Sequence, residues 1–134
     1  MNIVDNPEKE ILEILQSQLS YEDNNSSFGV GIVDLWSDIP DWHCIALADD
    51  NVPIGACTVL NTGELYKLYA SPAHRHKKVA ANLVLHVISV LKAAGEDKMF
   101  IEVAKQSLPF WNKFIVFNNI KFEQVDDFKI ILEI

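Results

Sequence analysis

The sequence predicts an α/β fold of the α+β kind, in which a mixed, mostly antiparallel central sheet is flanked by helices. Two observations lead to this prediction. Apolar residues recur at helical spacing in three segments, and short apolar or alternating runs typical of strands lie between them. The predicted order is helix, hairpin, strand, long helix, strand, helix, hairpin.

The first predicted helix opens at Asn6-Pro7, where proline is favoured, and ends near Tyr21. The residues from Glu22 to Ser27 are polar and predict a loop. Between Phe28 and Trp42 the pattern is too mixed to predict an element.

A hairpin is predicted next, with strands at His43–Ala48 and Val52–Leu60. A third strand covers Glu64–Ala70 and ends at Ser71-Pro72, because proline cannot donate a ladder hydrogen bond. The later predicted elements are a long helix at about His76–Ala94 capped by Gly95, a buried strand at Met99–Ala104, a helix at about Leu108–Asn119, and a hairpin of Phe122–Val125 with Phe128–Ile134.

Composition favours one domain over residues 1–134, because the chain shows no repeat, low-complexity tract or flexible linker. Eleven basic and nineteen acidic residues give a net charge of −8, which repels nucleic acid and anionic membranes and attracts cationic partners. No apolar run approaches the roughly 18 to 20 residues of a membrane span. Without a secretory pattern near Met1, we expect a cytoplasmic protein.

The metal-ligating residue types show no metal-binding pattern. Cys44 and Cys57 lack the spacing of a zinc site, and we expect both to be small buried hydrophobic residues without a disulfide. The four histidines have no suitably spaced carboxylate or cysteine partner: His43, His74, His76 and His86. The sequence therefore predicts no metal site.

A basic cluster lies where the third strand leads into the long helix. It contains Arg75, the only arginine, together with Lys77 and Lys78. Cations at a helix N-terminus oppose the helix dipole, so an anionic ligand such as a phosphate would resolve the conflict. The alternative is a solvated basic patch.

At these residues the chain resembles the GCN5-related N-acetyltransferase (GNAT) family. The run Glu64–Arg75 is similar to the family's fourth strand and its exit, and Arg75–Ala80 follows the pattern Arg/Gln-x-x-Gly-x-Gly/Ala with Lys78 in place of the first glycine. The ending Ile120–Glu123 is similar to the family's Leu-Gly-Phe. The resemblance covers about residues 40 to 134 and implies the acyl-CoA N-acyltransferase type of fold.

The resemblance also implies acetyl-CoA as co-substrate and a set of residues that bind it. Backbone groups of Leu68, Tyr69 and Ala70 would pair with the pantetheine arm, in a cleft opened by a splay between the strands at Glu64–Ala70 and Met99–Ala104. The pyrophosphate would lie at the following residues: Arg75, His76, Lys77, Lys78, Val79, Ala80 and Ala81. Lys78 would either crowd this loop or reach a phosphate oxygen.

Catalytic groups follow the family pattern less closely. Phe117 lies where the family often has a tyrosine that protonates the departing thiolate, and Trp111 takes that place in a second register. Neither is a suitable proton donor. Glu64 is the candidate general base, with Glu102 and Tyr66 as competitors.

Three functions are compatible with these residues. The first is transfer of an acetyl group to a primary amine of a small cationic molecule or peptide by direct attack. The second is a catalytically weak or inactive acyl-CoA-binding protein that acts as a regulatory partner. The third is recognition of a phosphorylated or nucleic-acid partner by the basic cluster, which the charge of −8 disfavours. We expect a monomer or a homodimer.

Overall fold

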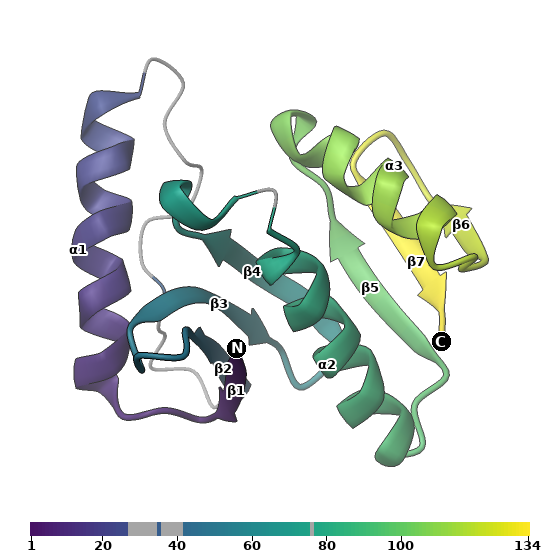
Figure 1. The fold of residues 1–134 in the computed structure, drawn as a ribbon. Helices are drawn as coiled ribbons and strands as arrows, with labels where there is room; N and C mark the ends of the chain where they lie inside the picture. Colours follow the sequence, from purple (N-terminus) through teal and green to yellow (C-terminus); the bar gives the residue numbers. More distant parts are fainter. Residues whose placement is uncertain (27–34, 36–41, 76) are drawn as a thin grey trace.

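The computed structural model describes residues 1–26, 35, 42–75 and 77–134, which form a seven-stranded sheet with helices packed against it (Figure 1). The elements are β1 (Asn2–Asp5), α1 (Lys9–Asn25), β2 (Trp42–Leu47), β3 (Pro53–Val59), β4 (Glu64–Ala70), η1 (Pro72–His74), α2 (Val79–Ala93), β5 (Lys98–Glu102), η2 (Lys105–Ser107), α3 (Leu108–Phe117), β6 (Phe122–Gln124) and β7 (Lys129–Glu133).

The sheet has the strand order β1-β2-β3-β4-β5-β7-β6. Every neighbouring pair is antiparallel except β4 and β5, which run parallel and are connected through α2. The prediction of a mixed, mostly antiparallel sheet flanked by helices is therefore confirmed.

The three α-helices are divided between the two faces of the sheet. Side chains of α1 pack with Ile45, Ala56 and Tyr69 in one cluster, whereas α2 and α3 share a second cluster with Cys44 and Cys57. Neighbouring residues of a strand point to opposite faces, so α1 lies on one face while α2 and α3 lie on the other (Figure 1). Both cysteines are buried free thiols, as predicted.

Two differences from the predicted elements lie in the N-terminal part. The strand β1 was not predicted, since only Ile3 and Val4 are apolar in it; it pairs with β2 from Asn2 opposite Leu47 to Asp5 opposite Cys44. Helix α1 also continues past Tyr21 into the predicted loop. Most of the segment from Phe28 to Trp42 lies outside the described residues.

The long helix starts at Val79 rather than His76, and η1 occupies part of the connection from β4. Its end agrees with the prediction. Gly95 has φ +88°, and the amide of Glu96 donates to the carbonyl of Leu91 at 2.9 Å, which is the geometry of a glycine cap.

Gly55 lets the start of α2 lie close to β3. A Cβ atom built on this glycine would lie 2.7 Å from Cγ1 of Val79 and 3.0 Å from the carbonyl oxygen of Tyr69. The first is a helix side chain and the second is backbone of the neighbouring strand, so little room exists for even one methyl group. Gly55 thus fixes the distance between the sheet and the N-terminus of α2.

The end of α1 is tied to the end of β4 by a carboxylate. The hydroxyl of Tyr69 donates to Glu22 at 3.1 Å, and the guanidinium of Arg75 donates to both carboxylate oxygens of Glu22. Arg75 also lies over the Tyr69 ring, 5.7 Å from its centroid. Glu22 lies in the part of α1 beyond Tyr21, so these contacts join the end of the helix to the end of β4.

Replacement of Gly55 by alanine should lower the free energy of unfolding by about 1 to 3 kcal/mol, because the methyl group forces α2 away from β3. Urea denaturation measures the change. The exposed substitution Ser89→Ala on α2 is the control and should stay within about 0.5 kcal/mol of wild type. Equal stability of Gly55→Ala and wild type would contradict the close approach.

Replacement of Tyr69 by phenylalanine should make the free energy of unfolding fall less steeply as the pH rises above the neutral range. Burial of the phenol, followed by its hydrogen bond to Glu22, raises the pKa of Tyr69, so the folded protein holds this proton more tightly than the unfolded chain. That contribution is fully present below about pH 10, the ordinary tyrosine value, and is lost as the pH rises further.

The free energy of unfolding, measured by urea denaturation from about pH 8 to about pH 11, should fall less steeply in Tyr69→Phe than in wild type. Tyr21→Phe, at a tyrosine that is 72% exposed, is the matched control and should follow the wild-type curve. Identical slopes for Tyr69→Phe and wild type would show that the pKa of this phenol is not raised in the folded protein.

Candidate active site

The two parallel strands at the centre of the sheet separate soon after they meet. β4 and β5 pair only at Glu64 with Phe100 and at Leu65 with Ile101. β5 continues along β7 to Glu102, whereas the rest of β4 keeps β3 as its partner. The predicted splay is therefore present, and among the described residues no strand lies beside one edge of β4 from Lys67 to Ala70.

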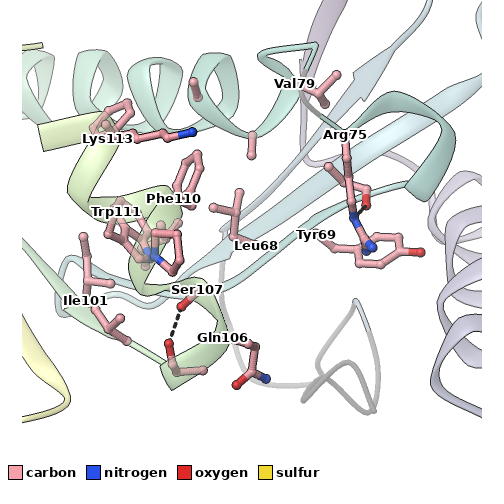
Figure 2. A pocket seen from close by; sticks show the side chains of 18 of the residues that line it. Leu68, Tyr69, Arg75, Val79, Ile101, Gln106, Ser107, Phe110, Trp111 and Lys113 are labelled. Carbon is pink, nitrogen blue, oxygen red and sulfur yellow. Dashed lines mark hydrogen bonds between the residues drawn. The ribbon is translucent and has the colours of Figure 1, made fainter. Parts of the chain in front are cut away.

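A cavity of about 1220 Å³ occupies this gap. One wall is formed by β4 and the first turn of α2, and the other by the end of β5, η2 and α3. Figure 2 shows Leu68 on the β4 wall, with Phe110 and Trp111 on one side of it and Tyr69 and Arg75 on the other. The cavity is somewhat larger than the roughly 300 to 1,000 Å³ of most small-molecule sites, so a large cofactor has room in it.

A β-bulge shapes the cavity wall. Thr58 pairs with Lys67 and Val59 with Leu65, so Tyr66 is an extra residue on β4. The bulge changes the alternation of the strand, and both Leu65 and Leu68 therefore pack in the cluster shared with α2 and α3. The side chain of Tyr66 is 52% exposed and lines the cavity.

The residue at the replaced glycine of the family pattern keeps a backbone conformation that favours glycine. Lys78 has φ +64° and ψ +16° and lies immediately before the first residue of α2. A non-glycine residue in this region costs about 1 to 2 kcal/mol. The Lys78 ammonium lies over the ring of Phe117, 5.5 Å from its centroid.

Arg75 has a different partner from the one expected. The sequence suggested an anionic ligand for the basic cluster, but Glu22 supplies a carboxylate to the guanidinium, and Arg75 Nε donates to the carbonyl of Ala70 at 3.1 Å. An internal ion pair therefore offsets this part of the positive charge. Glu22 was missed because it is 53 residues away and was assigned to a loop.

Most of the predicted cofactor-binding residues come together at the cavity. Those that line it are Leu68, Tyr69, Ala70, Arg75, Lys78, Val79, Ala80 and Ala81. Lys77 is exposed and is not among the lining residues, and His76 lies outside the described residues. The structure also adds wall residues that the sequence did not indicate: Lys105, Gln106 and Lys113.

The candidate catalytic groups lie at different places. Glu64 is at the closed end of the splay, one residue before the first lining residue of β4, and its own side chain does not line the cavity. Its two competitors, Glu102 and Tyr66, do line it. Phe117 lines the cavity and is 80% exposed, whereas Trp111 is 3% exposed and packs against Phe110 and Phe114.

The cavity is more basic than the protein as a whole. Its described lining residues include five cationic side chains, Lys67, Arg75, Lys78, Lys105 and Lys113, and two carboxylates, Glu22 and Glu102. In a chain with a net charge of −8, this places positive charge where a phosphate-bearing ligand would be stabilised. Among the described residues there is no group of three or more histidine, cysteine, aspartate or glutamate side chains arranged to hold a metal ion.

None of the described helices has the length and apolar character needed to cross a membrane. No curated protein matches the sequence.

Solved structures show the same fold over nearly the whole chain. A GNAT-family acetyltransferase from Staphylococcus aureus Mu50 is 13% identical, with 98% of each chain covered and a TM-score of 0.71. The PaiA N-acetyltransferase of Thermoplasma acidophilum, solved in complex with coenzyme A, is 22% identical, with 99% of this chain and 98% of that one covered and a TM-score of 0.68. Tetrahymena GCN5 is 9% identical, with 100% of this chain and 96% of that one covered and a TM-score of 0.71.

The sequence itself matches the acetyltransferase (GNAT) family model over residues 9–114, which include the splayed strands, the bulge and the start of α2. The family assignment therefore agrees with the arrangement of the cavity, and the chain belongs to the GNAT acetyltransferase family.

Proposed function

We propose that this protein is an N-acetyltransferase that uses acetyl-CoA as co-substrate and acetylates a primary amine of a small cationic molecule or peptide. The observation that carries the proposal is the basic cavity between β4 and β5 in a chain of the GNAT family. The coenzyme A complex of the PaiA relative supports the choice of co-substrate.

The backbone at the open edge of β4 fits an extended amide-bearing ligand. Leu68, Tyr69 and Ala70 pair with β3 on one side only, so the other edge is available to the pantetheine arm. The amide of Ser71 donates to Ile54, so by alternation the Tyr69 backbone faces β3, whereas the backbone groups of Leu68 and Ala70 face the open edge. The Ala70 carbonyl already accepts from Arg75 Nε, which leaves Leu68 and the Ala70 amide as the main pairing groups.

The start of α2 fits the phosphate groups of the same ligand. Amides in the first turn of a helix have no intrahelical acceptor, and Val79, Ala80 and Ala81 bring this turn to the cavity wall. Lys78 adds an ammonium group at the same place. Because Glu22 neutralises Arg75, we assign the larger electrostatic role to Lys78.

Acetyl-CoA supplies an activated thioester, whose carbonyl carbon forms the new bond to the acceptor nitrogen as the bond to sulfur breaks. The bulge at Tyr66 interrupts the β3–β4 ladder, and its unpaired backbone is our candidate to polarise the carbonyl. We propose that Glu64 accepts the proton of the amine through a water relay, with Glu102 or Tyr66 as the alternative acceptor.

The proposed class of amine acceptor is based on the net charge of the protein and on one carboxylate of the cavity. A net charge of −8 attracts cations, and Glu102 places a carboxylate on the cavity wall. A primary amine on a cationic small molecule or peptide therefore fits better than an anionic partner such as nucleic acid or a membrane surface. We further propose a single cytoplasmic domain over residues 1–134 that acts as a monomer or homodimer.

A second function is favoured by one observation. Phe117 lines the cavity without a hydroxyl group to protonate the departing thiolate. The alternative proposal is therefore a catalytically weak or inactive acyl-CoA-binding protein that acts as a regulatory partner. Release of free thiol from acetyl-CoA in a screen of amines separates the two: turnover supports the enzyme, and binding without turnover supports the regulator.

Replacement of Ala80 by aspartate should weaken acetyl-CoA binding by tenfold or more, roughly 1.4 kcal/mol or above. Ala80 lines the cavity in the first turn of α2, where an added carboxylate is favourable to the helix but repels a phosphate. Isothermal titration calorimetry gives the dissociation constant, which we expect in the micromolar range for wild type.

Ser89→Asp is the matched control, because it places the same charge on an exposed position of α2 outside the cavity and should leave the dissociation constant unchanged. Equal dissociation constants for Ala80→Asp and wild type would show that the phosphates do not bind at the start of α2. Failure of wild type to bind at millimolar acetyl-CoA would reject both proposed functions.

A further inference from the structure

Two of the positions at which this chain departs from the family pattern are in contact with each other. Lys78 stands in place of a glycine and Phe117 in place of a tyrosine, and 39 positions separate them in the sequence. In the structure the Lys78 ammonium lies 5.5 Å from the centroid of the Phe117 ring. This distance is within the range of a cation–π interaction.

Phe117 has little role in the core. Its side chain is 80% exposed at the last residue of α3, while the buried residues of that helix are Trp111, Phe114 and Ile115. Lys78 approaches from the opposite wall of the cavity, at the start of α2. The contact therefore spans the two walls and involves an aromatic ring that folding alone does not require.

The cavity holds its cations in two different ways. Arg75 is held by the carboxylate of Glu22, which offsets its positive charge. Lys78 is held by a neutral ring, which leaves the charge in place. A ring face also uses none of the three N–H donors in a directed hydrogen bond, so the ammonium keeps its capacity to bind an anion.

We propose that Phe117 is a positioning residue that holds the Lys78 ammonium at the cavity wall, where it contacts a phosphate oxygen of the coenzyme A ester. This inference rests on the proposed function, because it assigns a recognition role within the same site. The ring restricts a long, flexible side chain before the ligand arrives, which reduces the entropy lost on binding. Lys78 and Phe117 thereby act as one unit in phosphate recognition.

A double-mutant cycle on coenzyme A binding tests the proposal. Isothermal titration calorimetry would compare wild type, Phe117→Leu, Phe117→Tyr, Lys78→Met and the double variant Lys78→Met/Phe117→Leu. Phe117→Leu should raise the dissociation constant about two- to fivefold, and Phe117→Tyr should stay near wild type because it keeps a ring face. Lys78→Met should weaken binding by roughly tenfold or more, since a charge-assisted bond is lost.

The coupling between the two residues distinguishes positioning from a general structural effect. The double variant should bind no more weakly than Lys78→Met alone, because the ring acts only through the ammonium. High salt should reduce the difference between Phe117→Leu and wild type. Phe122→Leu, at a phenylalanine that is 51% exposed, is the matched control and should bind like wild type.

Two results would overturn the inference while leaving the proposed function intact: an unchanged dissociation constant in Phe117→Leu, or additive effects in the double variant. A wild-type protein that does not bind coenzyme A would instead overturn the proposed function and this inference together.

Discussion

The hydrogen bonding between β4 and β5 stops after two residue pairs, and the arrangement of the site depends on that interruption. Parallel strands that stayed paired would satisfy their backbone groups and leave no space between them. Here β5 follows β7 and β4 follows β3, so the central sheet opens into a cavity. Gly55 then allows α2 to approach β3 closely, which brings the first turn of the helix to the cavity wall.

The cationic side chains of the cavity differ in the groups that hold them. Glu22 binds Arg75 and Tyr69 and thereby connects α1 to the end of β4. The ion pair contributes to structure, while Lys78 remains opposite the neutral ring of Phe117. The replacement of glycine by Lys78 retains the left-handed backbone and adds a cation, so the altered pattern is compatible with phosphate recognition.

Local patterns predicted most of the fold because each depends on nearby residues. The strand Glu64–Ala70 was predicted with its observed bounds, and the Gly95 cap was recognised from helix-end chemistry. The short strand β1 and the last turn of α1 were missed because distant partners, β2 for the former and Arg75 and Tyr69 for the latter, support them. At the site, the cavity brought together most of the predicted lining residues, but the partners of Arg75 and Lys78 depend on tertiary contacts that spacing does not reveal.

The central claim is that the gap between β4 and β5 is the coenzyme A site. Backbone amide chemical shifts, followed by two-dimensional NMR during titration with coenzyme A, test it most directly. We expect the largest changes at Leu68–Ala70 and Val79–Ala81, with little change on β1 and β2. Changes concentrated on β1 and β2, or no change at millimolar coenzyme A, would contradict the account.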